Sequence, residues 1–587
     1  MQLYRQPFHF LSRNLHYTAQ RIISDTVTLF IKPRMVFSIG DFRLKRVTDY
    51  VDWKLLVFLI LFLNIKLEIK FIAILFIYIF QFDFKFGFKL KNSRLPLFYL
   101  FIIPIACIAF IVNKSYLYPK YMPEFITGIS FWVLSILAIH QIKLIVEKIE
   151  AEKIHRTIIV FFIINFIVSV FNLVVIMLIT RSINPYTFKE MHQIYFIMTG
   201  DYIKGLSFDI SSTNAVLSAF GVIYFLYKKM PVLLFICMAT LLLTCSNLIN
   251  LILLVVIAGI FIFKSSRDQK SYIVICIMMF LVFMIKISPQ NKGYSVETIK
   301  NTLHIRGDHS VKPAEAIIPL IKRPDSLLNT DEKKQKIALI NLSSIKRTGL
   351  LRPLNKQTFL LIHVPLTDNG RIYINSPNTN SEEYWLSKEI RPDQRVLLNF
   401  IAKHKNDLPM SRKETAKALP GKALGMLQTL SFFYKHPAKV ITGLGIGNFS
   451  SKIAFRATGL GLRGRYPEKY AYINRNFLSN HLDLYLSFFS GYAGNRSVSN
   501  NPFSVYDQLL SEYGLLGLLS LIIYYMGFFF QQKKHLTYGI PLLLFVIIIF
   551  FLDYWFEQLS IMVLFELLLF LNLKENEKSE KLKEVQI

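Results

Sequence analysis

Cysteine and recognisable metal motifs are both scarce in this sequence of 587 residues. The four cysteines, Cys107, Cys237, Cys245 and Cys276, lie inside or at the edge of apolar runs, where a thiol behaves as a small hydrophobic group. They therefore indicate no disulfide framework. The sequence has no HExxH motif, no DxD motif and no cysteine pair, so it shows no metal motif, and a metal bound by scattered Asp or Glu stays an alternative. We expect no cofactor.

Acidic residues are also few, and two organising features are missing. The chain has 38 Asp and Glu against 68 Lys and Arg. Its first 50 residues include eight Lys or Arg, but they lack the apolar stretch and small-residue cleavage site of a secretory signal. No internal repeat is visible, whereas many transporters consist of repeated halves. We therefore expect insertion through the chain's own membrane helices.

Long apolar runs dominate what is present. Hydrophobic residues make up 53% of the chain and gather in runs such as VFLILFLNIK and FIAILFIYIF. A helix needs about 20 apolar residues to cross a bilayer, and shorter ones are tolerated among neighbours. The pattern predicts an all-α polytopic membrane protein with about twelve transmembrane helices. These segments are 54–65, 69–84, 95–113, 125–143, 157–180, 210–227, 230–245, 248–263, 271–287, 509–530, 537–552 and 556–572.

The charges of the short connections predict the orientation. Basic connections such as Lys143 to Arg156 alternate with less basic ones such as RSINPYTFKEMHQ and DYWFEQ. By the positive-inside rule, both termini are expected in the cytoplasm and the ninth-to-tenth connection outside. The predicted parts are a basic cytoplasmic segment 1–53, helices one to nine in 54–288, a large, partly helical periplasmic loop 289–508, helices ten to twelve in 509–572, and a cytoplasmic tail 573–587.

The large loop is strongly basic. Residues 289–506 hold 32 Lys and Arg against 15 Asp and Glu. Loops longer than about 60 residues cross membranes largely regardless of charge, so this excess does not overturn the outside placement. That placement argues against nucleic acid as a partner. Anionic lipid headgroups or a phosphorylated substrate are expected instead.

Two segments of the loop have a predicted structure. Residues 289–408 are polar, with a hairpin expected where QTFLLIHVPL and RIYINS flank the turn TDNG. From Ser411, apolar residues recur at helical spacing until a break at His436 and Pro437. This pattern predicts an amphipathic helix that lies on the membrane or caps the helix bundle.

The stretch after that helix holds the candidate site. Gly443, Gly445 and Gly447 permit tight turns and close approach to a ligand, although they are also typical of a simple turn. His481 is a candidate general base, or else an ordinary polar loop residue. Guanidinium groups bind phosphate oxygens in a bidentate way, but arginines can equally form a headgroup-facing surface. The arginines concerned are Arg456, Arg463, Arg465 and Arg475.

Two motifs resemble a known family. HPAKVITGLGIGNF, followed by FSVYDQLLSEYGLLGLLSLIIYY, resembles the O-antigen polymerase and O-antigen ligase superfamily of bacterial envelope polysaccharide enzymes. The stretches GLSFDISSTNAVLSAFGVIYF and LLLTCSNLINLILL resemble its sixth and seventh helices. The architecture agrees over about 95–572, but the specific motifs cover only about 442–449 and 503–518.

The resemblance implies a metal-independent glycosyltransferase of the bacterial inner membrane, which polymerises repeat units linked to undecaprenyl diphosphate. The product would be O-antigen, capsule or exopolysaccharide. Arg181 and the arginine cluster would hold the diphosphate, and the catalytic candidates are His481 and Glu512, although Glu512 could instead orient a helix start. The remaining candidate substrate-binding residues are Gly445, Gly447 and Asn448. Membrane lipids, a chain-length regulator and a flippase are the expected partners.

Three alternatives remain open. One is a ligase or protein O-oligosaccharyltransferase of the same superfamily. Ligases often carry a histidine before the tenth helix, where this sequence has NNPFSVYDQ, and this difference favours a polymerase. The second is a lipid-linked oligosaccharide flippase or other transporter, which would usually show repeated halves and short loops. The third is a structural or sensory membrane protein.

Overall fold

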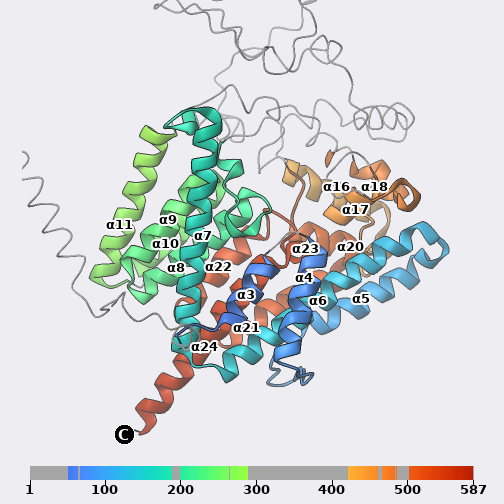
Figure 1. The fold of residues 1–587 in the computed structure, drawn as a ribbon. Helices are drawn as coiled ribbons and strands as arrows, with labels where there is room; N and C mark the ends of the chain where they lie inside the picture. The colour runs from blue at the N-terminus through green and yellow to red at the C-terminus, as the bar shows by residue number, and fades with distance from the viewer. Residues whose placement is uncertain are drawn as a thin grey trace, which may run out of the picture. The chain divides into compact units, whose positions relative to one another are not determined.

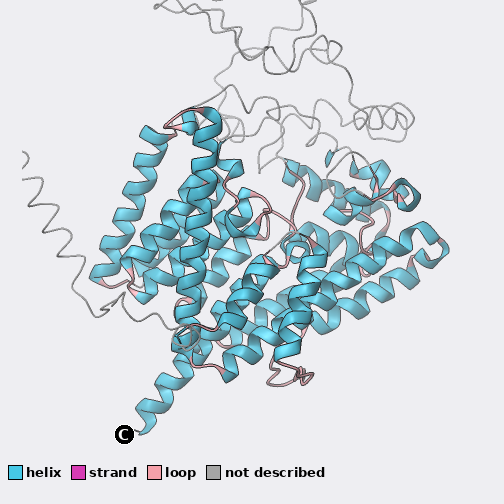
Figure 2. Ribbon diagram, in the orientation of Figure 1, coloured by secondary structure: helices cyan, strands magenta, loops and turns pink. Residues whose placement is uncertain are grey.

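The structure is a computed structural model that describes residues 50–63, 66–187, 199–263, 265–288, 421–459, 466–482, 484–485 and 501–585. Every regular element within these ranges is helical, as Figure 2 shows, which confirms the predicted all-α class. The hairpin expected around TDNG lies outside the described residues. Contacts divide the chain into units Met1–Val51 and Asp52–Ile587, and all the helices named below belong to the second unit.

Each predicted apolar segment falls on a helix. Those before the large loop are α3 (Trp53–Phe62), α4 (Leu67–Phe80), α5 (Phe98–Val112), α6 (Met122–Lys148), α7 (Ala151–Thr180), α8 (Ser211–Lys228), α9 (Pro231–Leu243), α10 (Asn247–Phe263) and α11 (Arg267–Val282). Those after it are α20 (Val505–Ser520), α21 (Gly527–Gln531), α22 (Gly539–Ile549) and α24 (Ser560–Val585). A four-residue helix, α23 (Trp555–Gln558), precedes the last of these.

Four helical stretches among the described residues are long and apolar enough to cross a membrane. They are Pro119–Lys148, Ala151–Thr180, Arg267–Ile287 and Val505–Gln531. Five further apolar helices, α5 and α22 among them, are only 10–17 residues long. Helices this short cross a bilayer only when neighbours shield them or the bilayer thins. The length and composition of these helices therefore favour a helical membrane protein.

The last helix, α24, forms the centre of the packing. From Ser560 to Leu573 it is buried throughout, as expected for a helix that is apolar on all sides. It contacts α3, α6, α7, α8 and α22 (Figure 1). Within Ser560–Leu573 the acid Glu566 accepts hydrogen bonds from the hydroxyls of Tyr99 at 2.5 Å and Tyr525 at 2.8 Å. These two donors from other helices allow a carboxyl group to lie inside the bundle.

Helix α20 is interrupted, although the sequence predicted an unbroken helix. Gly514 has φ 67° and ψ −166°, which is not helical. The freed backbone groups pair with the loop 440–445. Leu515 N–H donates to Val440 O at 2.7 Å, and Gly445 N–H donates to Glu512 O at 2.8 Å. Because these bonds replace the missing helical ones, the break is tolerated inside a membrane protein.

Three helix ends differ from the limits of the predicted apolar segments. The tenth helix starts at Val505 rather than at 509, because Val505 N–H bonds Phe550 O and Gln508 N–H bonds Ser504 O. The twelfth segment, expected from 556, is split by Leu559, whose φ is 60°. Helix α24 continues from the twelfth predicted segment through the predicted tail as far as Val585, and the placement of that tail in the cytoplasm stays a prediction.

Three short helices gather beside α20 and α23 (Figure 1): α16 (Gly421–Lys435), α17 (Lys452–Ala457) and α18 (Arg475–Asn480). Helix α16 confirms the helical prediction over Gly421–Lys435 and ends before His436 and Pro437, as expected, whereas the predicted start at Ser411 lies outside the described residues. One face of α16 is buried, and this face consists of Gly425, Thr429, Phe432 and Phe433.

Candidate functional site

The glycine loop and the break in α20 form one tightly packed unit. Gly443, Gly445 and Gly447 have φ values of 70°, 93° and 71°, a left-handed conformation that glycine adopts at no steric cost. A Cβ added to Gly443 would lie 2.5 Å from the backbone carbonyl of Glu512. A Cβ on Gly447 would lie 2.3 Å from Glu124 Oε1. The glycines therefore let this loop pass between the buried side chains of Glu124 and Glu512.

Glu124 is the most unusual residue of the site. It lies in the first turn of α6, is 1% exposed, and neither carboxylate oxygen has a hydrogen-bond partner among the described residues. The carboxylates of Glu512 and Glu557 are within electrostatic range. A buried acid without a donor is costly, so Glu124 is a candidate functional residue. The neighbouring Tyr121 donates its hydroxyl to Ile446 O at 2.6 Å and so fixes the loop above it.

Glu512 lies across the loop from Glu124. It is fully buried, and its Oε1 accepts a hydrogen bond from Phe449 N–H at 3.2 Å. The backbone N–H of Gly447 also contacts this carboxylate. Backbone donors hold the side chain in one orientation without adding a positive charge. Two carboxylates thus face the same short piece of glycine backbone.

Helix α17 brings positive charge to the acids. Lys452 forms an ion pair with Asp553, with 2.8 Å between Nζ and Oδ1. Lys452 and Arg456 both lie within electrostatic range of Glu557 on α23. Ser451 caps the helix by accepting a hydrogen bond from Ala454 N–H at 3.0 Å. Carboxylates and cations therefore lie side by side, which is the combination that a proton-accepting site for an anionic substrate requires.

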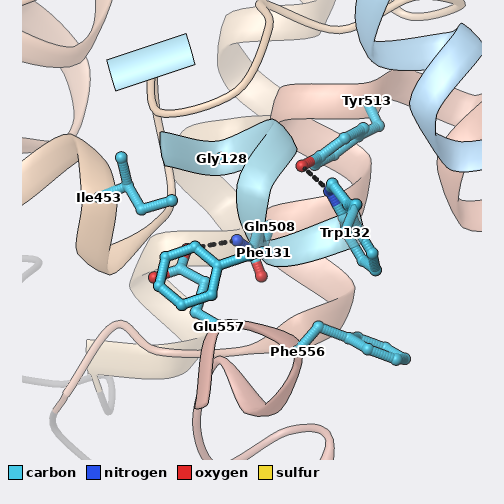
Figure 3. A pocket seen from close by; sticks show the side chains of 8 residues that line it. All are labelled: Gly128, Phe131, Trp132, Ile453, Gln508, Tyr513, Phe556 and Glu557. Carbon is cyan, nitrogen blue, oxygen red and sulfur yellow. Dashed lines mark hydrogen bonds between the residues drawn. The ribbon is translucent and has the colours of Figure 1, made fainter. Parts of the chain in front are cut away.

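A small aromatic cavity adjoins these acids (Figure 3). Its volume of about 10 Å³ is at the lower limit for one water molecule. Gln508 donates to Glu557 Oε1 at 2.5 Å, and the Trp132 indole N–H donates to the Tyr513 hydroxyl at 2.7 Å. The other lining residues are Gly128, Phe131, Ile453 and Phe556. Gly128 follows Glu124 by one helical turn, so the cavity and the acid share one face of α6.

The candidate base His481 is part of a buried network. It is fully buried, with Nδ1 2.9 Å from Gln428 Oε1 and Nε2 3.2 Å from Ser450 Oγ. Ser450 in turn donates to Asp507 Oδ2 at 2.8 Å. In a Ser-His-Asp triad the carboxylate accepts a hydrogen bond from the imidazole, whereas here Asp507 accepts one from Ser450. Both ring nitrogens are occupied by protein groups, and burial lowers the pKa of His481 to about 3, so it is a poor base here.

This histidine should make stability depend on pH. In the unfolded chain the imidazole has a pKa of 6.5, so between pH 6.5 and about 3 the unfolded state binds a proton that the folded state does not. The free energy of unfolding should therefore fall as the pH falls, by up to about 1.4 kcal/mol per pH unit. Thermal midpoints in detergent at pH 7 and pH 5 measure this slope. The His481→Gln variant should show a shallower slope, and equal slopes would contradict this role.

Lys422 ties α16 to the site. Its partly buried ammonium donates to Phe503 O at 2.7 Å, to Leu552 O at 2.9 Å and to the side chain of Asn501. Loss of water around it lowers the pKa of Lys422 to about 7. Three acceptors from two separate segments thus meet on one side chain.

The Lys422→Met variant should be destabilised by roughly 2–4 kcal/mol, because it leaves buried acceptors without a donor. Thermal unfolding in detergent measures the loss. Lys435→Met on the same helix removes an exposed lysine and serves as the control. Equal thermal midpoints for the two variants would show that the hydrogen bonds of Lys422 do not stabilise the fold.

The structure brings some of the predicted residues together and separates others. Gly445, Gly447 and Glu512 meet around one loop. Asn448 is buried and donates to Leu444 O at 2.9 Å. Arg456 is half-buried next to the acids, whereas Arg181 is exposed at the end of α7 and Arg475 at the start of α18. Arg463 and Arg465 lie outside the described residues.

Sequence reasoning missed Glu124, Glu557 and Lys452. The available signal was an acid directly before or after an apolar segment, in MPEF and in DYWFEQ. Within the described ranges no group of three or more His, Cys, Asp or Glu side chains could hold a metal ion. Comparison of the chain with protein-family models, curated proteins and solved structures finds no match.

Proposed function

We propose that this protein polymerises oligosaccharide repeat units carried on undecaprenyl diphosphate. One observation carries the proposal. The two segments whose sequences resemble the polymerase and ligase superfamily, about 442–449 and 503–518, pair by backbone hydrogen bonds into a single site. This site combines buried carboxylates with neighbouring cations, as the reaction requires. The resemblance supplies the substrate class, and the geometry supplies the residues.

The proposed step moves one proton and exchanges one bond. A sugar hydroxyl of the acceptor unit attacks the anomeric carbon of the donor glycan, and the new glycosidic bond forms as the bond to the diphosphate oxygen breaks. Glu512 takes the hydroxyl proton, and undecaprenyl diphosphate leaves with the electron pair. Arg456, with Arg463 and Arg465 from the same stretch, stabilises the negative charge on the leaving group. No oxidant or reductant is needed.

Glu124 would serve the acceptor. Neither of its oxygens has a hydrogen-bond partner among the described residues, so one can accept a hydrogen bond from a second hydroxyl of the acceptor sugar while Glu512 takes the proton of the attacking hydroxyl. His481 instead holds Ser450 and Gln428 in place behind the loop. We therefore assign catalysis to Glu512 and a supporting role to His481.

The proposed setting is the inner membrane of a bacterium. Twelve helices would cross it with both termini in the cytoplasm, and residues 289–508 would lie in the periplasm. In that arrangement the site faces the compartment in which polymerised glycans are assembled. A ligase or protein O-oligosaccharyltransferase of the same superfamily would use the same leaving group, and differs in its acceptor.

Deletion of the chain from its host separates these functions. Loss of a polymerase should leave single repeat units on their usual acceptor. Loss of a ligase should leave full-length polymer on undecaprenol, and loss of a flippase should trap repeat units inside the cell. Full-length surface polysaccharide after deletion would overturn the proposal.

A further inference from the structure

The helix α16 runs across the ends of two membrane helices. Near its start, Lys422 bonds Leu552 O, which follows α22. Beyond its end, Lys439 bonds the side chain of Asn113, which caps α5. A helix of 15 residues tethered to the ends of two different helices lies across the bundle rather than along it. The predicted topology places both of those ends on the outer side.

The face of α16 opposite its buried face is apolar and exposed. Leu427 and Leu430 are 49% and 50% exposed, and Tyr434 is 90% exposed. Their spacing of three and four residues puts them on one stripe. Ser431 and the exposed Lys435 lie to one side of that stripe. This helix therefore has two apolar faces, of which only one is covered by described residues.

The apolar stripe continues into a membrane-facing surface. After Tyr434 the chain reaches Ile441, which is exposed and whose carbonyl bonds Leu516 N–H. On α20, side chains before Gly514 are buried or half-buried, and the exposed apolar ones begin at Leu515 and Leu516. Ile441 thus meets α20 at the point where its lipid-facing surface starts. Continuity with a candidate membrane span favours lipid as the occupant of the stripe.

Exposed aromatic residues mark the same level of the bundle. Tyr116, Leu117 and Tyr118 follow Asn113, the residue that Lys439 contacts, and all three are exposed. Tyrosine is enriched where membrane meets water, because its ring is apolar and its hydroxyl is polar. The α5–α6 connection and the end of α16 therefore reach the membrane boundary together.

We infer that α16 is an interfacial helix whose stripe of Leu427, Leu430 and Tyr434 is inserted into the lipid bilayer beside α20. The partner is the boundary between acyl chains and headgroups, with Lys435 directed towards the phosphates. The insertion fixes the depth of the glycine loop that follows, close to headgroup level. The inference concerns only how α16 inserts into the membrane, and it does not depend on the reaction proposed above.

Spin labels test the insertion directly. In a background with the four native cysteines replaced by alanine, cysteines are introduced at Leu427, Leu430 or Lys435, or at Ile523 as a lipid-facing control. The labelled proteins are placed in vesicles of phosphatidylethanolamine and phosphatidylglycerol. Labels at Leu427 and Leu430 should be reached by oxygen more than by a water-soluble nickel complex, with a depth of roughly 5–10 Å. The label at Lys435 should favour nickel.

Two results would overturn the inference. Nickel access at Leu427 and Leu430 equal to that at Lys435 would place the stripe in water. Immobile labels that neither reagent reaches would show that protein covers it, either residues 289–420 or a second copy. A Leu430→Trp variant with native cysteines gives a second measurement, because brominated lipids should quench its added fluorescence. Unchanged added fluorescence would contradict insertion.

Discussion

The Gly443→Ala variant should lose most of its folded protein. A Cβ at this position would lie 2.5 Å from the Glu512 carbonyl carbon and oxygen and from Gly514 N, which are backbone atoms that cannot rotate away. The positive φ of 70° adds strain for any residue with a Cβ. Together these effects should cost roughly 3–5 kcal/mol. The yield of detergent-extracted protein and its thermal midpoint measure the loss.

The Gly459→Ala variant measures the cost of backbone strain without a steric clash. Gly459 also has a φ of 70°, but its added Cβ would meet only ordinary contacts, the nearest being Ala471 Cβ at 3.5 Å. That variant should lose about 1–2 kcal/mol. If Gly443→Ala were no less stable than Gly459→Ala, the close packing of the glycine loop against α20 would be wrong.

The Glu512→Gln variant should fold normally and fail to polymerise. Glutamine keeps the shape of the side chain and the acceptor for Phe449 N–H, but it cannot take a proton. General base catalysis contributes about 10²–10⁴-fold, so long surface polysaccharide should be replaced by single repeat units. Electrophoresis of the surface glycan shows the chain lengths, and the thermal midpoint reports folding.

Glu566→Gln is the matched control. Glu566 is also a buried acid, but its partners are Tyr99 and Tyr525 within the helix bundle. Its replacement should leave chain lengths unchanged. Normal polymer in Glu512→Gln, or equal loss in both variants, would remove Glu512 from catalysis.

Apolar patterning predicted the helices well, because a helix that contacts lipid or other helices must show its apolar residues in the sequence. Segments such as 125–143 and 157–180 therefore lie within α6 and α7. The break at His436 and Pro437 was also predictable, since proline cannot continue a helix. The interruption at Gly514 was not predictable, because it depends on backbone hydrogen bonds with Val440 and Gly445, which are far away in sequence.

The candidate site was predicted only in part for a similar reason. Glu512 and the glycines lie in recognisable motifs, and the structure brings them together. Glu124 gave only the signal of an acid next to an apolar segment, and its burial next to Gly447 and Glu512 cannot be predicted from that. His481 was a candidate base from its residue type, and the structure adds that both of its ring nitrogens contact protein groups. Residue type indicates possible chemistry, but burial and partners decide its use.

Incubation of the purified protein with a lipid-linked repeat unit tests the central claim most directly. The reaction is performed in vesicles without added metal, and the products are separated by length. We expect the natural chain to produce a ladder of glycans on undecaprenyl diphosphate, and Glu512→Gln to leave the single unit unchanged. Failure of the folded natural chain to extend the unit, or a ladder from the variant, would contradict the account.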